Sequence, residues 1–357
     1  MRPAVLAVLA LAVACNRSGD QATGFSTSIT TAPHGSTSEA ADESSTSSSS
    51  AEDSAAASSA SSTSSGSSTA ATITDVGNPP DGGSGPPPGC KGKVDIVFTI
   101  SSDELMLNQQ QQLKTSFPGF VATLEQQFAD FDYHILSVNT AGPWVLPWCA
   151  GCKDICPQTP DYPCNAVLEP CDSVHGAGVT FPRGDNASNK RCELASGRRY
   201  ITAPQPELLD AFTCIASVGT DGADLVAEAT VKALSNDLNA PGGCNEGFLR
   251  DDALLVVVAI QDTYDGFSDG TPQDWANALL DAKHGDGNAV VLLVISTDVD
   301  DPDSLCGYDP GSEHELRTWT KLVPHGLFGS ICAPSYAPFF AEAAAMIKTQ
   351  CDVFVPQ

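Results

Sequence analysis

Two short segments of the chain concentrate carboxylate side chains, which are the ligands that Ca²⁺ and Mg²⁺ prefer in proteins. Four aspartates lie within residues 298–303, and Asp262, Asp265 and Asp269 lie close together in an earlier segment. Neither segment has the spacing of an EF-hand calcium loop. We therefore interpret 298–303 as a solvated acidic loop, with a calcium site as the alternative.

The residue types that most often serve in catalysis do not form a complete constellation. The six histidines are scattered without a His-x-x-x-His pair, and no Gly-x-Ser-x-Gly nucleophile motif occurs. Cys149, Cys152 and Cys156 are spaced closely enough for a zinc or iron–sulfur site, but no histidine follows at zinc-finger spacing. We predict that the protein is not an enzyme and interpret these cysteines as disulfide partners, with metal binding as the alternative.

One tripeptide, Arg183-Gly184-Asp185, matches the motif that integrins recognise. A match of three residues arises easily by chance. We interpret the tripeptide as an exposed turn.

The amino-terminal residues have the features of an export signal. Arg2 is followed by an apolar run over 4–14 that is too short to span a bilayer and that leads into Cys15. This arrangement resembles the lipobox of bacterial lipoproteins, so we predict a signal peptide over 1–15 with Cys15 as the lipidated residue. An ordinary secretory signal is the alternative. Acyl chains would be the only membrane attachment, and Asn16 favours the outer membrane and cell surface.

A long segment with little to bury follows the export signal. Residues 16–89 are dominated by Ser, Thr, Ala, Gly and Pro, and no aromatic residue lies between Phe25 and Phe98. Such a composition cannot offset the entropy that folding would remove. We predict a disordered tether over 16–89 and a single folded domain over 90–357.

The folded part is strongly acidic. From residue 90 onward the chain holds 36 acidic and 15 basic residues, a net charge of −21. Charge of this sign excludes nucleic acid and anionic lipid as partners, and it is compatible with cation binding or with solubility alone.

Apolar runs alternate with amphipathic stretches from residue 90 onward. The runs expected to form strands are 94–100, 132–138, 253–260 and 289–295, and the stretches expected to form helices are 103–131, 206–217, 221–236, 272–283 and 336–350. This alternation predicts an α/β fold, a doubly wound and mostly parallel sheet with helices on both faces. Pro118 is expected to kink or split the first helix.

The stretch 141–200 interrupts the alternation. It contains six cysteines, several Pro and Gly residues and little periodicity. Because structureless loops of this length are uncommon, we predict a disulfide-rich insertion packed on the edge or the end of the sheet.

Several motifs in this order resemble a von Willebrand factor type A domain, in the form found in exported lipoproteins of the myxobacterial type. They are VDIVFTI (94–100) ahead of Met106, FPGF (117–120), FTCIASVGT (212–220), GFLRDDA (247–253) and GSIC (329–332). The resemblance covers about residues 92–350. It implies a Rossmann-like doubly wound fold and a binding or adhesion module at the cell surface whose ligand is an unknown protein or glycan. An envelope enzyme with metal in its acidic loops, or a structural envelope component, remains the alternative.

This family binds a divalent cation through an Asp-x-Ser-x-Ser loop, a threonine and a final aspartate. With Met106 as the anchor, the loop positions fall on Ser101, Asp103 and Leu105, and the other two fall on Thr220 and Asp262. The resemblance therefore implies a Mg²⁺ or Ca²⁺ site of Ser101, Asp103, Thr220 and Asp262. Because the Leu105 side chain has no oxygen, we expect a degenerate site, lost or remodelled, with weak or absent binding.

Twelve of the thirteen cysteines lie from Cys90 onward, an even number that indicates a disulfide framework in an exported chain. In the resembled family the terminal helix packs beside the central first strand, so the two ends of the domain approach each other. The resemblance thus implies a disulfide between Cys90 and Cys351.

Overall fold

The computed structural model describes residues 89–140, 167–312 and 314–356. The predicted signal peptide with Cys15, nearly all of the tether and the cysteines 149, 152 and 156 lie outside the described residues. The helices and strands alternate along the chain. Their bounds are β1 (Lys93–Ile100), α1 (Leu107–Gln127), β2 (Asp132–Asn139), β3 (Ile201–Thr202), α2 (Leu208–Ala216), α3 (Val226–Leu234), α4 (Asn236–Asn239), β4 (Leu254–Ile260), α5 (Pro272–Asp281), β5 (Val290–Ser296), α6 (Glu315–Leu322), β6 (Gly326–Ser330) and α7 (Ala337–Val353).

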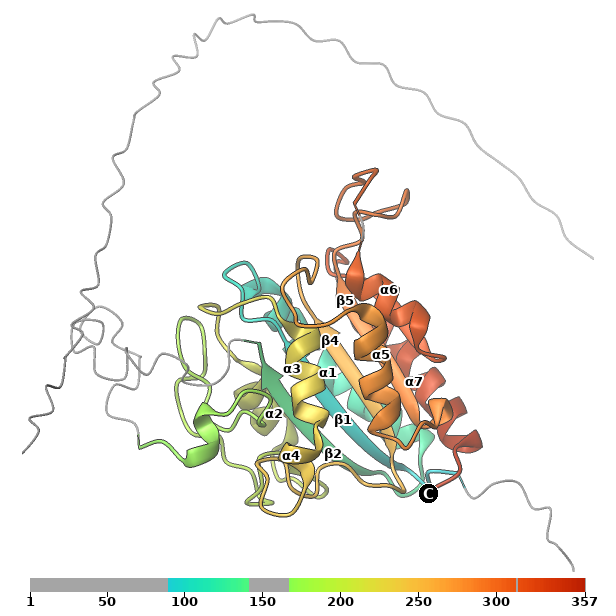
Figure 1. The fold of residues 1–357 in the computed structure, drawn as a ribbon. Coiled ribbons are helices and arrows are strands. Elements are labelled where there is room, and N and C mark those ends of the chain that lie inside the picture. Colours follow the sequence, from blue (N-terminus) through green and yellow to red (C-terminus); the bar gives the residue numbers. More distant parts are fainter. Residues whose placement is uncertain (1–88, 141–166, 313, 357) are drawn as a thin grey trace, which may run out of the picture. The chain divides into compact units, whose positions relative to one another are not determined.

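The strands form one six-stranded sheet in the order β3-β2-β1-β4-β5-β6 (Figure 1). All neighbouring strands are parallel except β3, which pairs antiparallel with β2 at the edge. Every residue of β4 and β5 is buried, which explains why both strands read as continuous apolar runs. The predicted doubly wound α/β fold is confirmed.

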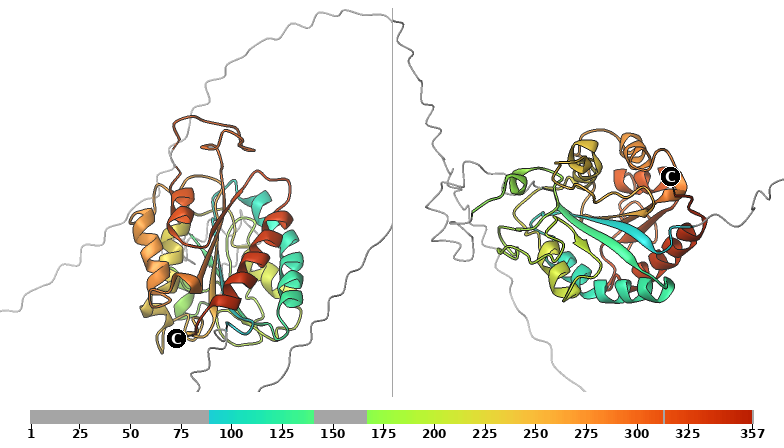
Figure 2. Two further views of the ribbon diagram at one scale, coloured as in Figure 1. Left: turned by 90° about the vertical axis from the view of Figure 1, so that its right-hand side faces the viewer. Right: turned by 90° about the horizontal axis from the view of Figure 1, so that it is seen from below.

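Two layers of helices enclose the sheet, and Figure 2 shows the sheet between them. On one face the buried residues of α1, α2 and α7 pack against alternate residues of β1, β4 and β5. On the other face α3, α5 and α6 contribute the buried side chains. Each central strand therefore supplies side chains to two cores, because successive residues of a strand point to opposite faces.

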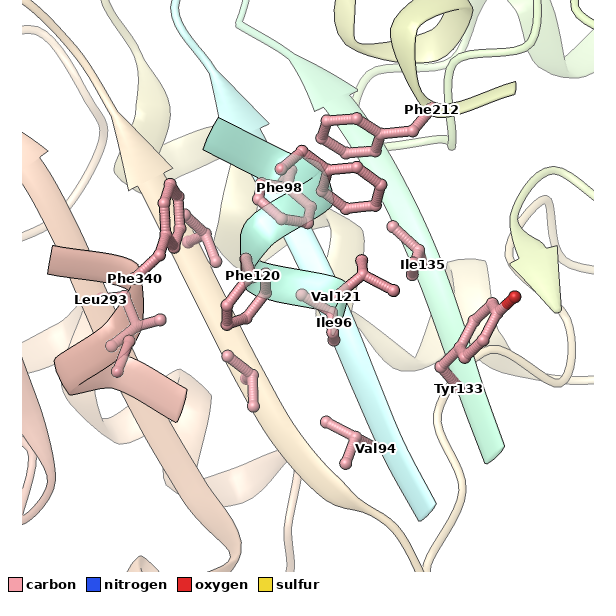
Figure 3. Packing of buried hydrophobic residues seen from close by; sticks show 14 of the residues in the cluster. Val94, Ile96, Phe98, Phe120, Val121, Tyr133, Ile135, Phe212, Leu293 and Phe340 are labelled. Carbon is pink, nitrogen blue, oxygen red and sulfur yellow. The ribbon is translucent and has the colours of Figure 1, made fainter. Parts of the chain in front are cut away.

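Aromatic rings fill the first of these cores (Figure 3). The Phe212 ring stacks on Phe117 with ring centroids 3.5 Å apart, and Phe98 lies 5.0 Å from Phe212 at a steep angle. Phe120 and Phe340 bring α1 and α7 together with centroids 4.9 Å apart. Burial of each such ring contributes about 2–3 kcal/mol.

Helix α1 runs through Pro118 without a break, so of the two expected effects, a kink or a split, the split is wrong. Proline removes one backbone hydrogen bond of the helix. Phe117 and Phe120, on either side of it, are each only 1% exposed, and their burial holds this turn of α1 against the sheet.

The described part of the insertion is fastened to the rest of the domain beside β2, where the Val179 amide donates to the Ser137 carbonyl at 2.8 Å. Disulfides join Cys171 to Cys244 and Cys192 to Cys214. Within the insertion the buried carboxylate of Asp172 accepts hydrogen bonds from Arg191 at 2.6 Å and Arg199 at 2.8 Å. These contacts replace regular secondary structure, and they agree with the predicted disulfide-held insertion at the edge of the sheet.

The two ends of the domain are joined at the edge of the sheet where the parallel strands begin. Cys90, three residues before β1, forms a disulfide with Cys351 of α7, with Cα atoms 4.8 Å apart. The Cys90 amide also donates to the Cys351 carbonyl at 2.9 Å. This is the pairing that the resemblance implied. A further disulfide joins Cys306 to Cys332.

None of the helices in the described ranges combines the length and the apolar character that a membrane crossing requires.

Candidate metal centre at the carboxyl edge of the sheet

The centre lies where strands β1 and β4 end side by side. Helix α1, which follows β1, packs on one face of the sheet, and α5, which follows β4, packs on the other. The chain therefore leaves two adjacent strands in opposite directions, and doubly wound sheets bind ligands at such a switch point. The Ser101 amide donates to the Ile260 carbonyl at 2.9 Å, so the two strand ends are in direct contact.

Three carboxylates converge at this point. One oxygen each from Asp103, Asp224 and Asp262 lies within 4.8 Å of the other two. Asp103 follows β1, Asp262 follows β4, and Asp224 lies two residues before α3. Since three partly buried carboxylates repel one another, the arrangement favours a bound cation.

Hydroxyl groups hold the Asp224 carboxylate in place. Ser101 Oγ donates to Asp224 Oδ1 at 2.6 Å, and Thr263 Oγ1 donates to Asp224 Oδ2 at 3.1 Å. Ser101 Oγ in turn accepts from the Asp103 amide at 3.1 Å, while Asp103 Oδ1 accepts from the Leu105 amide at 2.9 Å. The three loops that carry the carboxylates are thus linked by hydrogen bonds.

The amino terminus of α3 fixes the position of Asp224. The first amides of a helix have no partner within the helix. In α3 the amides of residues 226–228 donate to side chains of the β4–α5 loop, with lengths of 2.9–3.3 Å. The accepting side chains are Gln261, Asp265 and Ser268. Asp265 therefore caps a helix and is buried, so it belongs to the framework of the site.

Electrostatic strain is concentrated on Asp262. Burial, followed by the charges of Asp224 and Asp103, raises the pKa of Asp262 to about 6. Burial, together with the Asp103 charge, also raises the pKa of Asp224, although the hydrogen bond from Ser101 opposes the rise. The Oδ1 atom of Asp262 is buried and has no hydrogen-bond partner within the described residues. A divalent cation would reduce the repulsion among the three carboxylates and would give Asp262 Oδ1 a partner.

The structure brings together Ser101, Asp103 and Asp262, three of the four predicted ligands. The fourth, Thr220, is engaged elsewhere, because its hydroxyl accepts from Asn186 Nδ2 at 2.8 Å and lies 3.4 Å from the Asp185 carbonyl. Asp224 provides the third carboxylate and was not predicted. The Leu105 side chain is 65% exposed and contributes no ligand.

The acidic segment 298–303 has a structural role. Asp298 is buried, and its carboxylate accepts hydrogen bonds from Ser304 Oγ and from the amides of Leu305 and Cys306 at 2.7–3.0 Å. Asp300 pairs with Arg317 at 2.7 Å. Interpreting the segment as wholly solvated is therefore wrong, because two of its carboxylates shape the loop.

The integrin-type tripeptide is also only partly exposed. Arg183 is 7% exposed and pairs with Asp221 at 3.1 Å, whereas Asp185 is exposed. The expectation of an exposed turn is thus wrong for Arg183, whose side chain is not accessible to a receptor.

Fold and site together define a doubly wound α/β domain with an acidic centre at its carboxyl edge. No family model and no curated protein matches the chain. Among solved structures, proximal thread matrix protein 1 from the mussel byssus aligns with 74% of this chain and 48% of its own length at 11% identity, with a TM-score of 0.34. The pilus adhesin SpaC from Lactobacillus rhamnosus GG aligns with 74% of this chain and 32% of its own length at 9% identity, with a TM-score of 0.36. The chain thus spans half or less of these proteins, and similarity this low carries no argument about function.

Proposed function

We propose that this protein is a binding module of the bacterial cell surface that contacts its ligand through the carboxyl edge of the sheet and holds a divalent cation there. The observation that carries the proposal is the convergence of Asp103, Asp224 and Asp262 at the switch point between β1 and β4. We assign the domain to the von Willebrand factor type A class on its motifs, with a metal site remodelled around Asp224. We propose binding rather than catalysis for it.

The donor set is suited to Ca²⁺ or Mg²⁺. Both ions take oxygen ligands, and carboxylates supply the charge that retains them. We expected weak or absent binding because Leu105 stands where the resembled family has a hydroxyl ligand. That expectation did not include Asp224 as a third carboxylate. With Asp224 in the set, three negative charges face one cation. The bound ion would retain water positions that an oxygen atom of a ligand can replace.

Calorimetric titration of the full chain with Ca²⁺, Mg²⁺ and Mn²⁺ tests the cation site. We expect one site, and we expect Asp224→Asn to weaken it at least tenfold because one of three charged ligands is lost. Asp269→Asn is the matched control, since it removes the same charge from an exposed position of the β4–α5 loop. Absence of binding for all three ions, or equal loss in both variants, would refute the proposal.

The location follows from separate features. Four disulfides within the described residues indicate an oxidising compartment. We propose attachment to the outer membrane through acyl chains on Cys15. Metabolic labelling with a fatty acid should mark the wild-type protein, and Cys15→Ser should remove both the label and the membrane retention. Lipid that persists on the Cys15→Ser protein would contradict this assignment.

A further inference from the structure

Four loops surround the acidic centre, and they contain acidic residues but no Lys or Arg. We call residues 101–106, 217–225, 261–271 and 297–312 the carboxyl-edge loops. Together they contain twelve Asp and Glu residues and no Lys or Arg. Because β1, β4 and β5 are adjacent in the sheet, the loops that follow these three strands are neighbours. The loop after β5 extends beyond the others (Figures 1 and 2).

Basic side chains from elsewhere in the described residues offset little of this charge. Arg183 pairs with Asp221 at 3.1 Å, Arg317 pairs with Asp300 at 2.7 Å, and Lys114 donates to Ser217 at 3.0 Å. Twelve acidic residues and these three basic ones leave a net charge of −9. One divalent cation at the centre would still leave the surface strongly negative.

The same loops expose large apolar side chains. Five of them are between 51% and 75% exposed: Leu105, Tyr264, Phe267, Leu305 and Tyr308. They follow β1, β4 and β5, the three adjacent strands. Apolar side chains gathered at one edge and surrounded by charged residues are typical of an interaction surface, and exposed aromatic residues contribute most to such contacts.

We infer that the carboxyl-edge loops form a docking surface for a polypeptide in which Lys or Arg residues lie next to apolar side chains. This inference rests on the proposed function and specifies its partner. The unbalanced acidic charge attracts a cationic segment and repels anionic polymers, and the exposed apolar residues bury the segment's own apolar side chains. A neutral glycan would gain nothing from the charge.

The probe is a short synthetic peptide of alternating lysine and leucine, labelled for fluorescence anisotropy and titrated with the full chain. One control peptide replaces lysine by glutamate, and a second replaces leucine by serine. We expect the lysine–leucine peptide to bind more tightly than both controls, and we expect its affinity to fall as salt is added. A neutral oligosaccharide, maltohexaose, is the glycan arm. Maltohexaose binding in place of the peptide would overturn the inference.

Matched variants localise the binding. The edge variant combines Glu104→Gln, Asp269→Asn and Asp303→Asn, all exposed and outside the three-carboxylate centre. The control variant combines three exposed positions on α1, α5 and α7: Glu125→Gln, Asp281→Asn and Glu342→Gln. We expect the edge variant to weaken peptide binding about tenfold, the combined loss of three exposed ion pairs, and the control to change it less than twofold. Equal loss in both variants would overturn the inference.

A second pair of variants tests the contribution of the exposed apolar side chains to peptide binding. Phe267→Ser removes the most exposed aromatic side chain of the loops, whereas Val353→Ser removes an exposed apolar side chain at the end of α7. We expect at least a threefold weakening only for Phe267→Ser. All titrations are run with calcium and with chelator. Peptide binding that fails while calcium still binds refutes this inference alone, whereas absent calcium binding with intact peptide binding refutes only the cation site.

Discussion

Replacing Asp262 by asparagine should stabilise the cation-free domain at about pH 7.5. The pKa of Asp262 is raised from 3.8 to about 6 by burial and by the charges of Asp224 and Asp103. The folded state therefore holds this proton more tightly than the unfolded chain. The stability that the protonated Asp262 carboxyl contributes is fully present below about pH 4 and is lost as the pH rises through about 6. Because asparagine does not ionise, the Asp262→Asn variant does not lose stability in this way.

The expected magnitude follows from the size of the pKa rise. A rise from 3.8 to about 6 corresponds to about 3 kcal/mol for a fully shielded carboxyl. Asp262 is only partly buried, so solvent screening reduces the figure to about 1.5 kcal/mol. Asp262→Asn should thus raise the free energy of unfolding by about 1.5 kcal/mol at about pH 7.5 and leave it unchanged at about pH 4.

Urea denaturation of the full chain, with disulfides intact and chelator present, measures this difference. Asp269→Asn, exposed in the same loop, should change the free energy of unfolding by less than about 0.5 kcal/mol. Calcium at about a hundred times its dissociation constant should add about 2.7 kcal/mol to the wild type and much less to Asp262→Asn. An Asp262→Asn variant that is no more stable than the wild type at about pH 7.5, or whose advantage persists at about pH 4, would refute the electrostatic destabilisation by Asp262.

Three other measurements probe the site and the fold. Calcium affinity measured by calorimetry should fall about tenfold between about pH 7 and pH 5, because protons compete for Asp262, whose pKa is about 6; equal affinities would contradict this. Phe212→Ala should cost about 3–5 kcal/mol in urea denaturation, since Phe212 is fully buried against Phe117; a loss below about 1 kcal/mol would show that the core relaxes around the cavity. Replacing both Cys90 and Cys351 by serine should cost about 3–5 kcal/mol, because the disulfide closes a loop of 261 residues in sequence separation; an unchanged urea midpoint would exclude that role.

The central strands could be predicted from the sequence because their buried residues are consecutive and apolar. Leu254–Ile260 and Val290–Ser296 are buried along their whole length, so each run is apolar without interruption. β6 was not predicted, because Gly326–Ser330 is only partly buried and carries no apolar run. β3 has two residues, too few to show a period. Helix α6 was also missed, although its buried residues Leu316, Trp319 and Thr320 have helical spacing.

The candidate site, like the fold, could be predicted from the sequence only in part. Asp103 and Asp262 lie within three residues of the ends of β1 and β4, so the fold alone places them at one edge. Asp224 follows no strand, and its position depends on contacts between α3 and the β4–α5 loop that span 35 to 40 residues of sequence. No local pattern records such contacts. Thr220 has the expected residue type, but Asn186 of the insertion engages its hydroxyl.

If the chain is anchored ahead of Cys90, as proposed above, the disulfide between Cys90 and Cys351 has a mechanical consequence. The two cysteines lie where the parallel strands begin, whereas the acidic centre lies where β1 and β4 finish. A pull between an anchor before Cys90 and a ligand at the centre would therefore run along β1. It would load the hydrogen bonds of β1 to β2 and to β4 in shear, all at once, instead of opening them one by one. The covalent link would pass part of the same tension to α7, so the first strand would not bear it alone.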